Sequence, residues 1–297
     1  MQGVFYKTIL MKKILLSLVS LLCLANVIGQ VKDSITPVAI PKKTVATIFA
    51  GTVFAPRLHY YGRTDNQKSS ALLPTMLVQF DSVGLYASGT AVLLSNNTQQ
   101  LDYAGTVTEV GLRFGKLKGF AGNIYGNKFF YNTTQLPQSA LKEQAGLNVN
   151  YLSKIINITT GGSAAFSDNR TDFFTTAGLN KNFKKVKGKS VFVITPTAII
   201  NAGSQNFTSA HYKQNTIAGV PVNNTLVMES SRRFNILSYE FSSPVIWAYK
   251  NLFLIATPTV VLPQSVIKMP NFPQYSETAQ NLFFVNVTAL YSLKLKK

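Results

Sequence analysis

The sequence predicts an all-β fold, a transmembrane antiparallel up-and-down β-barrel of about twelve strands. The first observation is period-two alternation: in residues 156–167, Ile158 and Phe166 share one face, whereas Asn157 and Thr159 share the other. The second is that tight turns alternate with longer loops along the chain. The third is an apolar leader of the secretory type. Together these features favour a barrel that is apolar outside and polar inside.

About twelve segments carry the strand pattern, and bacterial single-chain barrels have an even number of strands. The connections after even-numbered strands are tight and often carry lysine, as in the basic turn expected at Lys184–Lys189. With a periplasmic N-terminus, the longer loops then face outward. Pro196 and Pro258 lie within otherwise strong strands, so we expect bulges or kinks there, or shorter strands that pair differently. The expected strands are Thr44–Ala55, Pro74–Phe80, Leu85–Leu94, Leu101–Phe114, Phe120–Tyr131, Ala145–Tyr151, Ile156–Phe166, Asp172–Phe183, Val191–Ala202, Phe234–Tyr249, Leu252–Leu262 and Leu282–Leu295.

The N-terminus predicts export. Residues 1–29 are expected to be a signal peptide, with Met11 as the true start, and residues 30–43 a periplasmic lead-in to a barrel at 44–297. The alternative is a retained anchor helix, although the apolar stretch is short for a membrane span. The single cysteine, Cys23, lies in this leader, so the mature chain needs no disulfide and no cysteine-based metal site.

The composition also favours a lipid-facing barrel. Charged residues make up 13% of the chain, against about 25% in soluble domains. The formal net charge of +18 becomes +15 when Lys7, Lys12 and Lys13 leave with the leader. The lysines fall mostly in turns and at the C-terminus. We therefore expect outer-membrane lipid and lipopolysaccharide as partners, and no nucleic acid.

Aromatic residues cluster near the ends of the expected strands. Phe120 and Phe130 lie ten positions apart on one face, which corresponds to about 25 Å along a tilted strand. This favours two aromatic girdles at the membrane interfaces. The alternative is a soluble β-sandwich with an aromatic core. The expected interface aromatics are Phe120, Phe130, Tyr151, Phe166, Trp247, Tyr249, Phe283 and Tyr291.

Charged residues are rare at the positions expected to face the lumen, which are mostly Gly, Ser, Thr and Asn. The exceptions are Glu109, Arg113 and Glu240, with Asp81 and Lys128 as further candidates. Ionised groups in a lumen must pair or meet water. Two interpretations stay open: a polar constriction that selects solutes, and a salt-bridge network that braces a closed barrel.

The sequence lacks a familiar catalytic or cofactor motif. Its two histidines, His59 and His211, fall in expected outward loops, and neither has a spacing typical of a lipase or deacylase. No cysteine or acid cluster accompanies either histidine. We therefore expect no enzyme activity, no catalytic residue, no metal and no cofactor.

The final strand has Phe283, Val285, Val287, Tyr291 and Leu293 on one face and ends in Lys296–Lys297. This resembles the closing strand that barrel-assembly machinery recognises, except that it does not end on an aromatic residue. With its leader and architecture, the whole chain resembles the small outer-membrane barrel proteins of the Bacteroidota. That resemblance implies a location in the bacterial outer membrane and says little about a substrate.

Two functions follow from these expectations. The first is a porin-like channel or passive transporter for small polar solutes. The second is a closed structural or partner-docking barrel, an accessory subunit of a secretion or surface-assembly complex, with Ser204–Arg232 and Gln264–Gln280 as the docking loops. A secreted soluble β-protein is the remaining alternative.

Overall fold

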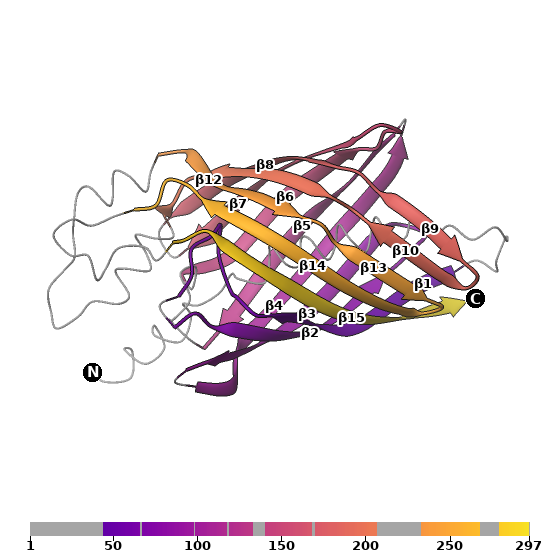
Figure 1. Cartoon of the computed structure of the whole chain (residues 1–297), viewed down its shortest axis with the longest axis horizontal. Helices are drawn as coiled ribbons and strands as arrows, with labels where there is room; N and C mark the ends of the chain where they lie inside the picture. Colours follow the sequence, from indigo (N-terminus) through magenta and orange to yellow (C-terminus); the bar gives the residue numbers. More distant parts are fainter. Residues whose placement is uncertain are drawn as a thin grey trace, which may run out of the picture.

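The strands of this protein close on themselves to form one barrel (Figure 1). The computed structural model describes residues 44–65, 67–97, 99–117, 119–132, 140–167, 170–206, 233–267 and 279–296. The expected signal peptide and lead-in, residues 1–43, lie outside these ranges. Among the described residues, no helix is long and apolar enough to cross a bilayer.

Fifteen strand segments make up the sheet, and three pairs of segments continue one another. β8 continues into β9, β10 into β11, and β12 into β13, so the barrel has 12 strands, which confirms the predicted fold class. The segments are β1 (Thr44–Ala55), β2 (Ser70–Gln79), β3 (Leu85–Asn96), β4 (Gln99–Leu117), β5 (Phe120–Tyr131), β6 (Leu141–Tyr151), β7 (Asn157–Ser167), β8 (Thr171–Asn180), β9 (Phe183–Lys187), β10 (Ser190–Ile194), β11 (Thr197–Gly203), β12 (Asn235–Ser242), β13 (Val245–Tyr249), β14 (Leu252–Pro263) and β15 (Leu282–Lys296).

Each strand pairs antiparallel with the next along the chain, and β1 pairs with β15 to close the barrel. At this closure Gly51 lies opposite Leu290. A Cβ atom on Gly51 would lie 2.0 Å from the carbonyl oxygen of Ala289, so only glycine allows the first and last strands to approach this closely.

The two ends of the barrel differ in their connections. At one end, here called the turn end, short turns join the strands, and Gly119 and Gly188 take the positive φ angles of 89° and 59° that such turns need. The longer connections lie at the other end, here called the loop end (Figure 1). The sequence predicted this division.

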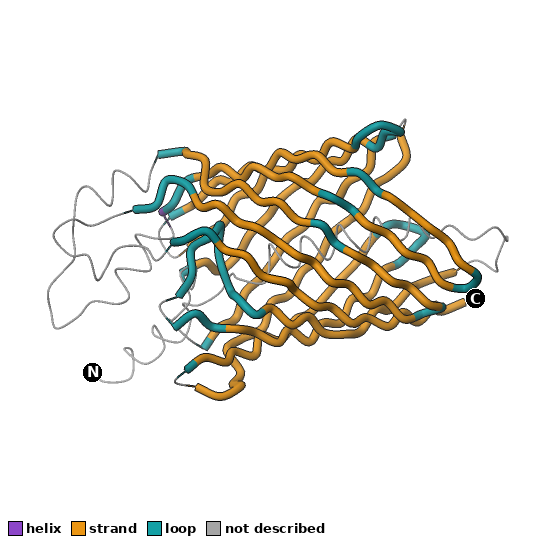
Figure 2. Tube along the Cα trace, viewed as in Figure 1, coloured by secondary structure: helices purple, strands orange, loops and turns teal. Residues whose placement is uncertain are grey.

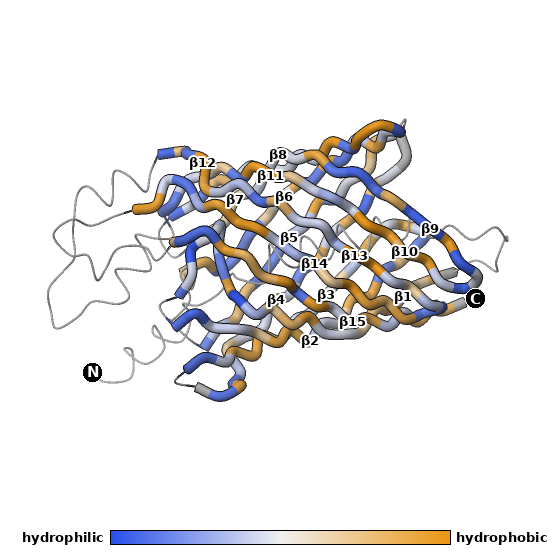
Figure 3. Tube along the Cα trace, in the orientation of Figure 1, coloured by the Kyte–Doolittle hydropathy of each residue, from blue (hydrophilic) through white to orange (hydrophobic). Residues whose placement is uncertain are grey.

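Side chains alternate between the two faces of the barrel wall. In β15, Phe283 is 70% exposed and the adjacent Phe284 only 5%, and Tyr291 is exposed next to the buried Leu290. Figure 3 shows hydrophobic stretches along the strands, with hydrophilic residues gathered in many of the connections. The outer face thus presents the apolar band that a lipid-facing barrel needs.

Interruptions cross neighbouring strands at one level of the barrel (Figure 2). β8 is separated from β9 by residues 181–182, β10 from β11 by residues 195–196, and β12 from β13 by residues 243–244. At each break a backbone N–H donates to a proline carbonyl on the next strand: Lys181 to Pro196, Thr195 to Pro244, and Ser243 to Pro258. We call this line the proline seam.

The structure at the seam refines the prediction of bulges, kinks or shorter strands at the two prolines. Pro196 interrupts its strand, as expected, whereas Pro258 lies inside the continuous β14. Pro258 is tolerated because its missing N–H faces the break between β12 and β13. The basic turn predicted at Lys184–Lys189 was wrong, because most of that segment is strand β9 and only Gly188–Lys189 turn.

Candidate functional site

The connection between β1 and β2 folds into the loop end of the barrel. We call residues 56–65 and 67–69 the mouth segment. At its tip Tyr60 and Arg63 exchange backbone hydrogen bonds of 2.8 and 3.0 Å across a two-residue turn. Tyr61 and Gly62 have φ angles of 52° and 81°, as a type I′ hairpin turn requires. The mouth segment is therefore a small hairpin with a defined tip, where the sequence predicted an outward loop.

Arg63 fixes this tip to segments that follow two other strands, β14 and β11. Its side chain is 1% exposed. Nη2 donates to the backbone oxygens of Gln264 (3.1 Å) and Ser265 (3.2 Å), which follow β14, and to the side-chain oxygen of Gln205, which follows β11. Nη1 donates to the backbone oxygen of Tyr61 at 3.1 Å. One guanidinium thus joins three segments that are remote in the sequence.

Aromatic packing holds the same hairpin in place. The rings of Tyr60 and Tyr61 lie 6.0 and 5.5 Å from the ring of Phe174 on β8. The His59 ring lies 5.1 Å from that of Phe284 on β15, and its Nδ1 accepts a hydrogen bond from the N–H of Gly62 at 3.3 Å. Burial lowers the pKa of His59 to about 4, so this histidine is neutral at pH 7.

A cluster of buried apolar side chains lies inside the barrel below the mouth. The cluster includes Phe49 from β1, Tyr125 from β5 and Ile255 from β14, and it continues into the mouth segment through Leu58. Every strand segment except β9 and β11 contributes a buried residue to it. The sequence predicted a polar lumen, and the structure corrects this. The inward positions carry Leu, Phe and Tyr as well as Asn and Thr, so the strands are apolar on parts of both faces.

A chain of polar contacts crosses the interior on β2 to β5. The hydroxyl of Tyr86 donates to Oε1 of Glu109 at 2.7 Å and accepts from Nδ2 of Asn123 at 3.0 Å. The guanidinium of Arg113 lies 4.9 Å from the centre of the Tyr86 ring and donates to Oε1 of Gln79. Tyr86 thus connects the predicted lumen residues Glu109 and Arg113, and Glu109 is 4% exposed.

The same chain continues to the turn end. Nε2 of Gln79 donates to Asp81 at 3.0 Å, and the hydroxyl of Thr47 on β1 donates to the same carboxylate at 2.9 Å. On the other side, Asn148 of β6 donates to Asn123 at 3.3 Å. These side chains tie six neighbouring strands together from the inside, from β1 to β6.

Glu240 belongs to a different cluster. It is 6% exposed on β12 and accepts hydrogen bonds from Nδ2 of Asn201 (2.9 Å) and from the hydroxyl of Ser238 (3.0 Å). Asn201 in turn accepts from Thr176 on β8 at 2.9 Å. The structure therefore divides the three predicted charges between two separate hydrogen-bonded groups.

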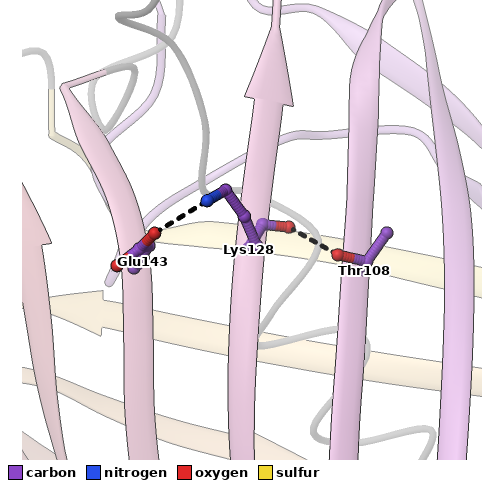
Figure 4. Close-up of polar contacts among 3 residues, drawn as sticks. All are labelled: Thr108, Lys128 and Glu143. Carbon is purple, nitrogen blue, oxygen red and sulfur yellow. Dashed lines mark hydrogen bonds and ion pairs between the residues drawn. The ribbon is translucent and has the colours of Figure 1, made fainter.

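Lys128 was expected to face the lumen, and this was wrong. Its Nζ lies 3.0 Å from Oε1 of Glu143 on β6, and both side chains are more than half exposed. Figure 4 shows this pair beside the hydrogen bond from Thr108 to the Lys128 carbonyl. Lys128 is out of phase with the buried Asn127 and Phe129, so alternation places it outside.

The expected interface aromatics lie mostly on the outer face. Phe120 and Phe130 are 48% and 50% exposed on β5. Trp247, half-buried, stacks on Tyr249 with ring centres 6.3 Å apart. Phe174 also lies near a strand end, but it is buried in the mouth. The other exposed members are Tyr151, Phe166, Phe283 and Tyr291.

Sequence reasoning missed the residues that close the mouth. The outward loop expected around His59 contains Tyr60, Tyr61 and Arg63. The loop expected at Ser204–Arg232 contains Gln205. Tyr61–Gly62 was the available signal, since a glycine in a two-residue turn marks a tight hairpin. Among the described residues, no group of three or more His, Cys, Asp or Glu is placed to hold a metal ion. His211 and most of the two predicted docking loops lie outside the described residues.

Comparison with known proteins gives distant likenesses of shape. No family model and no curated protein matches the sequence. Among solved structures, the chain is similar to LpxR from Salmonella typhimurium, with 8% identity, a TM-score of 0.43, and 82% of this chain and 99% of that chain covered. It is also similar to the β domain of the Bordetella autotransporter BrkA (10% identity, TM-score 0.35, 83% and 96% covered) and to the copper transporter OprC (8%, 0.24, 85% and 44%).

One expectation is corrected by this comparison. The sequence predicted that the chain is not an enzyme, but LpxR is a lipid A deacylase and thus an enzyme of the outer membrane. The likeness to LpxR is too distant to transfer any residue role to this chain.

Proposed function

We propose that this chain is an outer-membrane β-barrel with a closed interior that serves as a docking subunit of a secretion or surface-assembly complex. The observation that carries the proposal is Arg63, whose buried guanidinium fixes the mouth segment to carbonyl oxygens of the segment that follows β14. A seated hairpin over a packed apolar interior leaves the outer wall and the two ends as the surfaces for interaction.

The interior polar groups support the same proposal. Glu109 and Glu240 are buried, and each accepts hydrogen bonds from neighbouring strands. Charges that line an aqueous channel are hydrated, whereas buried charges need partners of this kind. The arrangement favours the bracing network over the selective constriction. Passive transport of polar solutes stays a prediction, and it would require the mouth segment to move out of the barrel.

The outer-membrane location is part of the proposal. It is supported by the apolar outer face and by the exposed aromatics near the strand ends, such as Phe120 and Phe283. The short turns would then face the periplasm, and the mouth segment the outside of the cell. The expected leader at residues 1–29 and the resemblance to Bacteroidota barrels also support an outer-membrane location.

Reconstitution in planar lipid bilayers tests whether the barrel is closed. We expect the full chain to give no conductance steps under conditions in which a known porin conducts. Regular steps from the unmodified protein would overturn the closed barrel and favour the porin-like alternative. Cross-linking and co-purification from native outer membranes test the docking role, and a barrel that always isolates alone would contradict it.

A further inference from the structure

Strand β9 has a free edge at the turn end. On one side it pairs with β10 from Phe183↔Ile194 to Lys187↔Ser190. On the other side, β7 accompanies β8 only as far as Asn157↔Asn180, so the described residues provide no neighbour for β9. All five residues of β9 are exposed. Its outer backbone N–H and C=O groups are therefore available to another strand.

The position of this edge relative to the membrane follows from its neighbours. Lys185 pairs with Phe192, which pairs with Trp247 on β13, and Trp247 stacks on Tyr249. Such aromatic residues mark the headgroup level of a membrane protein. An unpaired strand edge does not occur in the hydrocarbon region, because its polar groups would lack partners there. β9 thus lies at or beyond the headgroups, within reach of the aqueous phase.

The charge around β9 has one sign. Three of its five residues, Lys184, Lys185 and Lys187, are lysines, and much of the segment is hydrophilic in Figure 3. Among the described acidic residues, the one at the turn end is Asp81, which already accepts bonds from Thr47 and Gln79. Further lysines of this end are Lys154, Lys181, Lys189, Lys250 and Lys294.

We propose that the edge of β9 is the docking site for an extended, acid-rich segment of a partner protein, which adds to the sheet as a strand. This rests on the proposed docking role and names the chemistry of the partner. In strand addition the main chain supplies hydrogen bonds and the alternate side chains supply specificity. Acidic side chains opposite the β9 lysines would form cross-strand pairs of opposite charge.

Two other occupants fit the edge less well. A second copy of the chain would place lysines opposite lysines across the new strand pair, and like charges there are destabilising. Anionic lipid matches the lysines but has no backbone to pair with the free N–H and C=O groups. Lysines on an edge strand also oppose unselective pairing, so they exclude neutral and basic segments while attracting an acidic one.

The test uses the full chain in nanodiscs of neutral phosphatidylcholine. The probe is a labelled twelve-residue peptide of alternating glutamate and threonine, and its control replaces each glutamate with glutamine. We expect the acidic peptide to bind in a fluorescence anisotropy titration and to slow amide hydrogen exchange at residues 183–187. The variant K184Q/K185Q/K187Q should weaken binding about tenfold, because several opposite-charge pairs are lost at once.

The matched control is K154Q/K250Q/K294Q, which removes three lysines from the same end but none from β9. It should change the affinity less than threefold. Equal losses in both variants, or binding without protection of the β9 amides, would overturn the proposal in favour of unspecific attraction. If vesicles containing phosphatidylglycerol bind through β9 while the peptide does not, the lysines serve lipid and the proposal is wrong.

These outcomes are separable from the proposed function. Conductance by the unmodified barrel would refute the closed interior but would leave peptide binding at β9 as measured. Failure of the peptide to bind, with partners still co-purifying from native membranes, would refute the β9 site and leave the docking role intact.

Discussion

The guanidinium of Arg63 donates to the side-chain oxygen of Gln205, 142 residues further along the chain. The contact joins the β1–β2 connection to the segment after β11, on different parts of the barrel wall. Nη1 of the same guanidinium also lies 3.5 Å from the backbone oxygen of Leu237 on β12. Arg63 therefore joins several segments at the loop end. Four predictions follow from this side chain and from other contacts that hold the barrel together.

The Arg63→Ala variant should lose stability. The part-buried carbonyl oxygens of Gln264 and Ser265 would lose their buried charged donor, and hydrogen bonds to a charged group contribute up to about 3 kcal/mol each. We expect the free energy of unfolding in detergent to fall by about 3 kcal/mol in a urea titration. Arg57→Ala is the control, because Arg57 belongs to the same mouth segment but donates to the Lys68 carbonyl in an exposed hydrogen bond. Equal losses in both variants would contradict this role of Arg63.

The stability of the mouth segment should depend on pH through His59. Its pKa is about 4 in the folded barrel because of burial, and about 6.5 when unfolded. Between these values the unfolded chain binds a proton that the folded chain does not, so stability falls as the pH falls from 6.5 to 4. The linkage corresponds to about 3 kcal/mol at most.

The measurement for His59 is the difference between wild type and His59→Gln. Glutamine keeps an acceptor for the Gly62 N–H but does not titrate in this range. We expect the wild type to lose more stability than the variant between pH 7 and pH 4.5 in parallel urea titrations. Two parallel pH profiles would show that His59 is not the group responsible.

Glu109→Ala should destabilise the barrel far more than Glu143→Ala. The first leaves the buried Tyr86 hydroxyl without its acceptor and opens a cavity, at a cost of about 3 kcal/mol. The second removes one partner of an exposed ion pair, which contributes about 0.5 kcal/mol. Urea midpoints in the same detergent give the comparison. A similar loss for both would mean that the interior network does not brace the wall.

The Gly51→Ala variant should impair closure of the barrel. Its Cβ would meet backbone atoms of Ala289 and Leu290 on β15, and these cannot move without separating the first and last strands. We expect a smaller folded fraction, seen as loss of heat-modifiable migration on gels. Gly89→Ala is the control, because a Cβ there meets nothing within 4 Å. Normal folding of Gly51→Ala would refute the close approach of β1 and β15.

The sequence predicted the wall of this barrel much better than its interior. Bounds such as Phe120–Tyr131 are recovered because alternation and turn residues are local signals. The partners of Arg63 and the contact between Tyr86 and Glu109 depend on which strands meet across the barrel, and no local pattern encodes that. Lys128 was assigned to the wrong face of β5. An error of one residue in the alternation is enough to move a side chain from the inner to the outer face. The buried position of Phe174 could not be predicted either, because an aromatic residue near a strand end can belong to a girdle or to a core.

The proline seam gives the barrel an uneven resistance to force around its circumference. Where it crosses, a strand is held to its neighbour through a proline carbonyl in place of the regular ladder. A pulling force on β9, β10 and β13 would therefore deform the wall at the seam before it breaks the regular strand pairs of β8, β11 and β12. A partner attached at the turn end would bend the part of the wall formed by β9, β10 and β13, while the pairing of β1, β14 and β15 keeps the barrel closed.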